Sequence, residues 1–240
     1  MSEPYDPDNL LDRVSRPARL ELHYEQERRR ERELLARCLP FSGGDVLSVG
    51  CGWHPGRHLF PAPAFRMTGV ELDEPVVRAL VAEGELDHGV AGRAGELAFP
   101  DESFDVVLYR LVLHHVAYQG PLGPVFQEAR RLLRPGGALV AVEPGSWHPV
   151  GAALALANRA GLGEPMHGTP DDVPLSPRAL LREARAAGLQ PELHTVTYGW
   201  RRLPRALQRS LHRLDRSGSR AGAARFGHTL MLIARRPAQW

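Results

Sequence analysis

A glycine-rich turn directly after a buried-strand pattern is the segment of this chain best suited to bind a ligand. The sequence VLSVGCGWHPG at 46–56 runs from apolar residues into glycines spaced G-x-G-x-x-x-G. Glycine is needed where a backbone turns sharply and where a ligand approaches main-chain amides. Glu71 follows Gly50 by 21 residues, at the end of the next predicted strand. A carboxylate at that place can accept hydrogen bonds from both hydroxyls of a ribose, so the pattern predicts a nucleoside site.

Two other interpretations of the turn were weighed against this one. The first is a tight turn without a ligand, in which Glu71 is only a surface acid. The second is a nicotinamide enzyme, and the glycine spacing counts against it. Dinucleotide enzymes prefer G-x-G-x-x-G, in which the third glycine packs a helix close under a pyrophosphate. Here Gly56 comes one residue late and follows Pro55, so the sequence indicates no pyrophosphate site.

Short apolar runs alternate with helical patterns, and these elements must position the glycine turn. A broken apolar stripe and i,i+4 pairs of Glu and Arg predict a helix from Arg19 to Leu39. Predicted strands lie at 45–50, 67–71, 87–92, 103–109, 138–142, 192–198 and 228–234. Predicted helices lie at 75–83, 122–133 and 177–187, and a turn lies at 134–137. This alternation predicts an α/β fold with a parallel sheet covered by helices on both faces.

The composition indicates a globular protein with a large core. The chain has 240 residues, of which 43% are hydrophobic and 24% charged; this excludes a disordered tail, a disulfide mini-protein and a collagen-like chain. It has no apolar run long enough for a membrane span. Its first residues, MSEPYD, are acidic and polar, unlike a secretory signal. Cys38 and Cys51 share no metal-type spacing. We therefore expect a cytoplasmic protein with reduced thiols and no metal.

Several stretches resemble class I S-adenosylmethionine-dependent methyltransferases, specifically the small-molecule branch that includes the ubiquinone/menaquinone-type enzymes. VLSVGCG at 46–52 is similar to the first motif of this family, and TGVELDEPVV at 68–77 to its second strand and ribose-binding acid. ELAFPDESFDVVLYRLVLHHV at 96–116 is similar to the adenine-side loop and the fourth strand, and EARRLLRPGGALVAVEP at 128–144 to the fifth strand and the helix before it. GHTLMLIARRP at 227–237 resembles the reversed last β-hairpin.

The resemblance implies a Rossmann-like, doubly wound sheet of seven strands, mostly parallel with a reversed last strand, and helices on both faces. It divides the chain into an N-terminal lead-in and cap helix at 1–39 and a methyltransferase-like domain at 40–240, with an inserted lid at about 146–176. The implied cofactor is S-adenosylmethionine, and the implied reaction is methylation of an O, N or C atom of a small or medium organic substrate. The cofactor-binding residues implied are Gly50, Cys51, Gly52, Gly56, Glu71, Leu72, Ala94 and Arg110.

The chain departs from the family pattern at two positions. Ser48 stands where the family usually has Asp or Glu, which removes a carboxylate near the methionine ammonium group. Arg93 stands where the family commonly has an Asp beside an Ala to hold the adenine amino group. The glycine loop is also longer than the common G-x-G-x-G. These departures support an alternative function, in which a cofactor-binding fold no longer methylates and acts as a scaffold, a regulator or a catalyst of a different reaction.

Methyl transfer to an oxygen is helped by a base that takes the proton of the nucleophile, and histidine suits this role near neutral pH. The two candidates are His148, in a segment after the fifth strand, and His115, in the LHHV stretch after the fourth. One histidine of that stretch can instead serve local backbone groups, and Glu143 can cap or buttress the loop. Adjacent histidines on a turn are expected to point apart, which argues against a two-histidine metal site.

The segments outside the sheet pattern are expected to form the substrate chamber. The N-terminal helix with Tyr24, and the stretch 146–176 with Trp147, His148, Met166 and His167, are predicted to roof a partly apolar pocket.

The C-terminal part of the chain is basic: residues 146–240 hold 14 Arg and 6 acidic residues. In the stretch 201–225, four leucines at 203, 207, 211 and 214 share one helical face. This favours an ordinary amphipathic helix packed on the sheet, with a weak acidic partner as the alternative. The stretch lacks the aromatic and basic platform that stacks bases, so no nucleic acid is expected. The expected assembly is a monomer or a homodimer.

Overall fold

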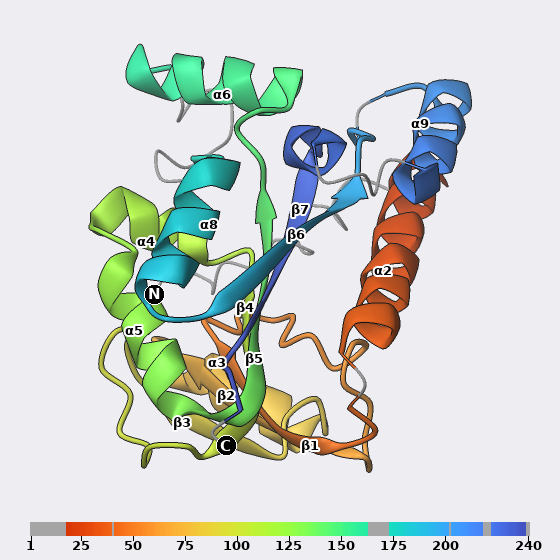
Figure 1. The fold of residues 1–240 in the computed structure, drawn as a ribbon. Helices are drawn as coiled ribbons and strands as arrows, with labels where there is room; N and C mark the ends of the chain where they lie inside the picture. Colours follow the sequence, from red (N-terminus) through yellow and green to blue (C-terminus); the bar gives the residue numbers. More distant parts are fainter. Residues whose placement is uncertain (1–17, 40, 163–172, 202, 218–221, 239–240) are drawn as a thin grey trace.

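The computed structural model describes residues 18–39, 41–162, 173–201, 203–217 and 222–238. These residues form one seven-stranded sheet in the order β3-β2-β1-β4-β5-β7-β6 (Figure 1). The strands are β1 (Gly44–Val49), β2 (Phe65–Glu71), β3 (His88–Ala91), β4 (Phe104–Arg110), β5 (Leu133–Pro144), β6 (Gln190–Thr197) and β7 (Thr229–Arg235). β7 is antiparallel to both of its neighbours, and the pairs among the first five strands are parallel. The predicted Rossmann-like sheet with a reversed last strand is confirmed.

The central strands form because their side chains are buried on both faces. Val46 and Leu47 of β1 point to opposite sides and are both fully buried. A strand with two covered faces is expected to be a continuous apolar run, which explains why the sequence pattern located β1 so closely. The strand order reverses between β1 and β4, and ligands of open α/β sheets bind at the carboxyl ends of strands at such a point.

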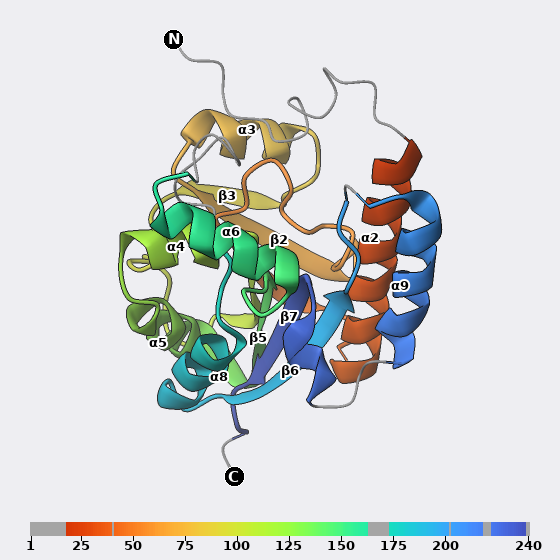
Figure 2. The same ribbon diagram turned by 90° about the horizontal axis from the view of Figure 1, so that it is seen from above.

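Helices cover both faces of the sheet. One face packs against α4 (Leu113–Gln119), α5 (Gly123–Leu132) and α8 (Pro177–Ala186) through a core that includes Leu47, Val107 and Leu139. The other face packs against α2 (Ala18–Cys38) and α3 (Glu74–Ala82) through a core that includes Val46, Leu108 and Val140. Seen from above, α6 (Pro149–Arg159) crosses over the edge where the parallel strands end (Figure 2). α9 (Arg205–Ser217) runs beside α2, and a short 3-10 helix, η1 (Ala223–Phe226), precedes β7.

Two local predictions were wrong in instructive ways. The predicted turn at 134–137 lies inside β5, because the register shifts between Phe104↔Leu133 and Val106↔Ala138 and thereby absorbs Arg134-Pro135-Gly136-Gly137 as an irregularity of the strand. The stretch after β4, expected as a turn, is the short helix α4. Its two histidines do not point apart: their ring centroids are 4.0 Å from each other.

The packing of α9 also differs from the expectation. Its inward face is polar: Gln208 and Asp215 are buried, whereas Leu207 and Leu214 are about half exposed. Gln208 donates from Nε2 to backbone carbonyls at the start of the helix, and Asp215 accepts a 2.7 Å hydrogen bond from the Tyr198 amide. Leu207 and Leu214 therefore point toward solvent, whereas Leu203 and Leu211 are half-buried.

In the part of the chain that the structure describes, none of the helices has the length and apolar character needed to cross a membrane.

Candidate cofactor and methyl-transfer site

The glycine turn lies at the carboxyl end of β1, as predicted. Gly50 and Gly52 have φ angles of +62° and +45°, a region that side chains with a Cβ adopt at a cost. A Cβ on Gly50 would lie 2.3 Å from Cγ2 of Val112, so this glycine is required by packing against the neighbouring loop. A Cβ on Gly52 would meet no atom within 4 Å. Gly52 therefore borders open space, where the backbone can be approached by a ligand.

Glu71 connects the end of β2 to this turn. Its Oε2 accepts the Gly52 amide at 2.9 Å, and its Oε1 accepts the Leu72 amide at 2.7 Å. The carboxylate is half-buried and is thereby fixed beside the open side of the turn. Carboxylate oxygens have further lone pairs, so Glu71 can still accept hydrogen bonds from a ligand.

The other predicted cofactor residues divide between surface and packing positions. Leu72, next to Glu71, is 64% exposed, an apolar side chain that a flat apolar ring could cover. Ala94 is half-buried in the loop after β3. Cys51 is buried, and burial together with Glu71 raises the pKa of its thiol to about 12, so it is an inert neutral group. A Cβ on Gly56 would lie 2.6 Å from Leu108, which gives this glycine a packing role.

Arg110, at the end of β4, lies in a buried ionic cluster with helix α2. Its Nη2 and Nε atoms lie 3.3 and 3.4 Å from the two carboxylate oxygens of Glu31. His58 contacts the same carboxylate, with Nε2 3.0 Å from Oε2. Burial alone would raise the pKa of Glu31, but Arg110 and His58 outweigh it and hold the pKa below its usual value. The Arg110–Glu31 pair is therefore ionised and fixes α2 against the carboxyl edge of the sheet.

Glu27 lies one helical turn before Glu31 and faces the same region. Its Oε1 accepts a 2.6 Å hydrogen bond from the Thr229 hydroxyl, and His23 Nε2 lies 3.6 Å away. Burial raises the pKa of Glu27 to about 7, and the nearby charge of Glu31 acts in the same direction. A carboxyl group with such a pKa can exchange a proton near neutral pH.

Because Glu27 binds its proton more tightly in the fold than in the unfolded chain, it contributes a pH-dependent stability. This contribution is fully present below the unfolded pKa, 4.5, and is lost as the pH rises through about 7. We expect a Glu27→Gln variant, which cannot ionise, to gain stability relative to the natural chain when the pH is raised from 5 to 8. Thermal unfolding at both pH values measures this. If the difference in melting temperature between the variant and the natural chain is the same at pH 5 and at pH 8, Glu27 does not hold a proton in the folded state.

Glu143, at the end of β5, forms a structural cap. Its Oε1 accepts the amides of Val112 and Leu113 at 2.9 and 2.7 Å, and its Oε2 contacts His114 Nδ1 at 2.6 Å. The carboxylate thus provides acceptors for amides at the start of α4 that have no partner within the helix. Its negative charge is also stabilised by the positive end of the helix dipole. His114 is the histidine that serves the loop, whereas His115 is half-buried and its ring lies against that of His114.

His148 is the N-cap of α6, where its Nδ1 accepts the Val150 amide at 3.2 Å. Its ring meets that of His228 edge to face, with centroids 5.1 Å apart. Burial lowers the pKa of His148, so the ring is neutral at pH 7. Because Nδ1 accepts the Val150 amide, the neutral ring carries its proton on Nε2, so in this arrangement neither nitrogen can take a proton from a substrate. Trp147 beside it packs on Phe226 and lies under the guanidinium of Arg178.

A cavity of about 830 Å³ opens between α4, α6 and residues 173–176. Its size lies within the range of small-molecule pockets. The apolar residues of α6 that line it, among them Ala152, Ala155 and Leu156, come from the run expected to face the substrate. Tyr118, Asn158 and Arg159 add polar groups. Among the described residues that line this cavity, none comes from α2, and Trp147 and His148 are absent as well. The cavity is therefore not roofed by Tyr24, Trp147 and His148 as the sequence predicted. Met166 and His167 lie outside the described residues.

The polar stripe of α2 was missed in the sequence. His23, Glu27 and Glu31 are spaced i, i+4, i+8 and fill the gaps of the broken apolar stripe, so they share the buried face. Titratable residues that interrupt an apolar stripe at helical spacing were the signal that could have revealed them.

One segment of the chain matches the model of a known protein family. Residues 47–141 match the family model described as "Methyltransferase domain". This segment contains the glycine turn, Glu71 and the switch point of the sheet. This segment is similar to a methyltransferase domain.

Curated relatives match a little under half of the chain. A Mycolicibacterium smegmatis protein named as a probable S-adenosylmethionine-dependent methyltransferase is 36% identical over 114 residues, which cover 46% of this chain and 41% of that protein. The 27-O-demethylrifamycin SV methyltransferase of Amycolatopsis mediterranei is 35% identical, covering 44% and 40%. The nocamycin O-methyltransferase of Saccharothrix syringae is 37% identical, covering 45% and 40%. The matched segments thus span about two fifths of these relatives' own length.

Solved methyltransferases share the fold over nearly the whole chain. A methyltransferase of Thermotoga maritima superposes with a TM-score of 0.62 at 18% identity and covers 95% of this chain and 98% of its own. A methyltransferase of Archaeoglobus fulgidus has a TM-score of 0.59 at 16% identity, covering 96% and 100%. The [4+2]-cyclase SpnF also has this fold, with a TM-score of 0.58 at 22% identity, covering 88% and 81%.

The residues of the methyltransferase-like segment fit S-adenosylmethionine, the cofactor that the family implies. The open side of Gly52 is a cradle that a Cβ would fill, and Glu71 lies beside it with lone pairs to spare. The buried Nε1 of Trp53, in the same loop, has no hydrogen-bond partner among the described residues and can donate one. Ser48 is buried within β1 and brings no charge to the site. Arg93 is exposed and directly precedes the half-buried Ala94.

Removal of the Glu71 carboxylate is expected to weaken binding of S-adenosylmethionine to the methyltransferase-like segment by tenfold or more. A charge-assisted pair of hydrogen bonds contributes roughly 1.5–3 kcal/mol. Isothermal titration calorimetry of Glu71→Ala against the natural chain measures the loss. The matched control is Glu74→Ala, an exposed carboxylate in the first turn of α3. Equal affinities for the natural chain and Glu71→Ala would mean that the ribose lies elsewhere.

Proposed function

We propose that this protein transfers the methyl group of S-adenosylmethionine to a hydroxyl of a small or medium, partly apolar organic molecule. The observation that carries the proposal is the position of the glycine turn, with Glu71 bonded to the Gly52 amide, at the carboxyl ends of the parallel strands. Glu27 contacts Thr229 farther along the same edge of the sheet. The named functions of two relatives, the 27-O-demethylrifamycin SV and nocamycin O-methyltransferases, agree with a small-molecule hydroxyl.

The cofactor-binding residues of the proposal are those of the turn and its surroundings. Gly50, Gly52, Glu71, Leu72 and Ala94 hold the nucleoside end. Arg110, ion-paired with Glu31, offers a buried positive charge at the end of β4, where the methionine part of the cofactor would lie. S-adenosylmethionine, when bound, supplies a methyl group on a positively charged sulfur. What the protein adds is alignment, exclusion of water and removal of a proton.

Glu27 is the best candidate for the base that takes the hydroxyl proton. It lies at the carboxyl edge, is shielded from water and titrates near neutral pH. His115 and His148 stay as predicted alternatives. His148 could act as the base only after its Nδ1 gives up the cap of α6, whereas His115 lies half-buried with its ring against that of His114.

The substrate site of this proposal is the cavity beneath α6, continued along the carboxyl edge of the sheet to Glu27, which is not among the residues that line the cavity itself. Apolar side chains of α6 would line it, and Tyr118, Asn158 and Arg159 would orient polar groups of the substrate. Both cysteines are free and buried, which agrees with action in the reducing cytoplasm.

The second candidate function is a methyltransferase-fold protein that binds the cofactor without methylating. SpnF, a [4+2]-cyclase with this fold, makes that class of reaction a real alternative. The two are separated by incubating the full chain and S-adenosylmethionine with a panel of hydroxylated aromatic and polyketide-like compounds. Formation of S-adenosylhomocysteine together with a product heavier by one methylene unit supports the proposal. Cofactor binding with conversion of a compound but no S-adenosylhomocysteine supports the alternative.

A further inference from the structure

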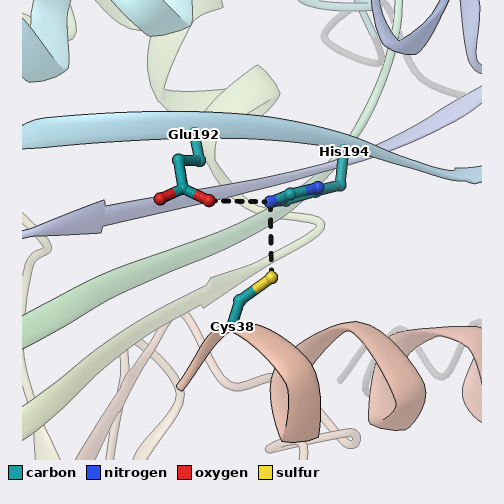
Figure 3. Close-up of side chains that lie close together, drawn as sticks. All are labelled: Cys38, Glu192 and His194. Atoms are coloured by element: carbon teal, nitrogen blue, oxygen red, sulfur yellow. Dashed lines mark hydrogen bonds and ion pairs between the residues drawn. The ribbon is translucent and has the colours of Figure 1, made fainter. Parts of the chain in front are cut away.

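Three side chains of metal-binding types meet between the end of α2 and the strand β6 (Figure 3). Cys38 lies in the last turn of α2, and Glu192 and His194 lie on the edge strand β6. Residues two apart in a strand point to the same face, so Glu192 and His194 both face the end of the helix. Their sequence separation from Cys38 explains why no metal-type spacing was visible in the sequence.

The distances among the three groups suit a single ion. His194 Nε2 lies 3.6 Å from Cys38 Sγ and 3.6 Å from Glu192 Oε2, as the dashed lines in Figure 3 show. One ligand atom from each residue lies within 4.8 Å of the others. Zinc bonds of about 2.3 Å to sulfur and 2.0–2.1 Å to nitrogen or oxygen, at tetrahedral angles, place ligand atoms roughly 3.3–3.6 Å apart. The three side chains therefore need only small adjustments to close around an ion.

The surroundings give the cluster shelter on one side and access on the other. Cys38 is buried and the His194 side chain is 14% exposed, whereas that of Glu192 is 48% exposed. An ion can enter from the Glu192 side, where water can complete its coordination. Arg235 donates from Nη1 to Glu192 Oε1 at 2.7 Å, which orients the carboxylate and leaves Oε2 toward His194. Such outer hydrogen bonds are typical supports of metal ligands.

We propose that Cys38, Glu192 and His194 bind a divalent transition-metal ion, best matched by Zn²⁺. Thiolate, imidazole and carboxylate together suit this borderline-soft ion better than Mg²⁺ or Ca²⁺, which prefer oxygen ligands alone. Binding replaces the proton of the Cys38 thiol, which passes to solvent, with a metal–sulfur bond. The ion would fasten the C-terminal end of α2 to β6, and α2 is the helix that carries Glu27 and Glu31.

Cobalt spectroscopy on the full chain tests the site. After treatment with a chelator and its removal, the protein is titrated with Co²⁺ and then with Zn²⁺. We expect a thiolate-to-cobalt charge-transfer absorption in the near ultraviolet that saturates at one ion per chain and disappears as Zn²⁺ displaces Co²⁺. Thermal unfolding with and without Zn²⁺ is expected to show a higher melting temperature in its presence.

Variants identify the ligands. The chain has two cysteines, so Cys38→Ser should abolish the charge-transfer band and Cys51→Ser should keep it. Glu192→Gln and His194→Ala should each weaken Zn²⁺ binding by more than about tenfold. Loss of a residue that only supports a metal ligand already weakens binding by about that factor, and loss of a ligand itself should cost more. His88→Ala, an exposed histidine on β3, is the matched control.

The proposal is overturned if the natural chain gives no charge-transfer band, or if Cys38→Ser keeps it. If Cys38→Ser does not fold, Zn²⁺ affinities of Glu192→Gln and His194→Ala equal to that of His88→Ala overturn it instead.

Discussion

A Gly52→Val variant is expected to lose measurable binding of S-adenosylmethionine while its fold stays intact. The φ angle of Gly52, +45°, is costly for any residue with a Cβ and most costly for a β-branched one. The added side chain would enter the open side of the turn, where nothing else lies within 4 Å of its first atom. Binding is measured by calorimetry and folding by circular dichroism.

Gly84 offers a matched control for this variant. It has a φ angle of +76° and also borders open space, but it follows α3 and is not part of the glycine turn. Gly84→Val therefore imposes a comparable backbone strain without blocking the turn. Normal cofactor binding by Gly52→Val, or an equal loss in both variants, would contradict the assignment of the turn.

A Glu27→Gln variant is expected to lose most of its methyl transfer to a hydroxyl substrate while binding the cofactor almost normally. General base catalysis typically contributes a factor of about 10²–10⁴ to the rate. Glu27, whose pKa is raised to about 7 by burial, accepts a proton only when ionised. The rate of the natural chain should therefore rise with pH through about 7, and this rise should be absent from the residual rate of the variant.

Glu25→Gln is the control, because Glu25 is exposed on the same helix. If Glu27→Gln keeps the rate and pH profile of the natural chain, Glu27 is not the base. A large loss in His115→Ala or His148→Ala alone would then assign the proton transfer to a histidine.

Most of the fold could be predicted because the information is local. The strands of a sheet covered on both faces are continuous apolar runs, and β1 and β7 were located within one residue at each end on that basis. The order of glycine turn, strand and acid likewise located Glu71 at the end of β2.

The errors lie where long-range partners decide the structure. The Pro-Gly-Gly segment of β5 has a local turn signal, but pairing with β4 keeps it in the sheet. α4 is a helix because Glu143, about thirty residues away, caps its first amides. The buried polar groups of α2 became visible only with their partners Arg110 and Thr229, since a charged side chain on a helix is exposed unless tertiary contacts satisfy it.

The central claim, that the turn at 50–56 and Glu71 form a site for S-adenosylmethionine, is tested most directly by calorimetric titration of the full chain. We predict saturable binding to one site per chain, with a rise in melting temperature at the same ligand concentrations. No heat and no thermal shift at millimolar S-adenosylmethionine would contradict the account of the pocket and of the function built on it.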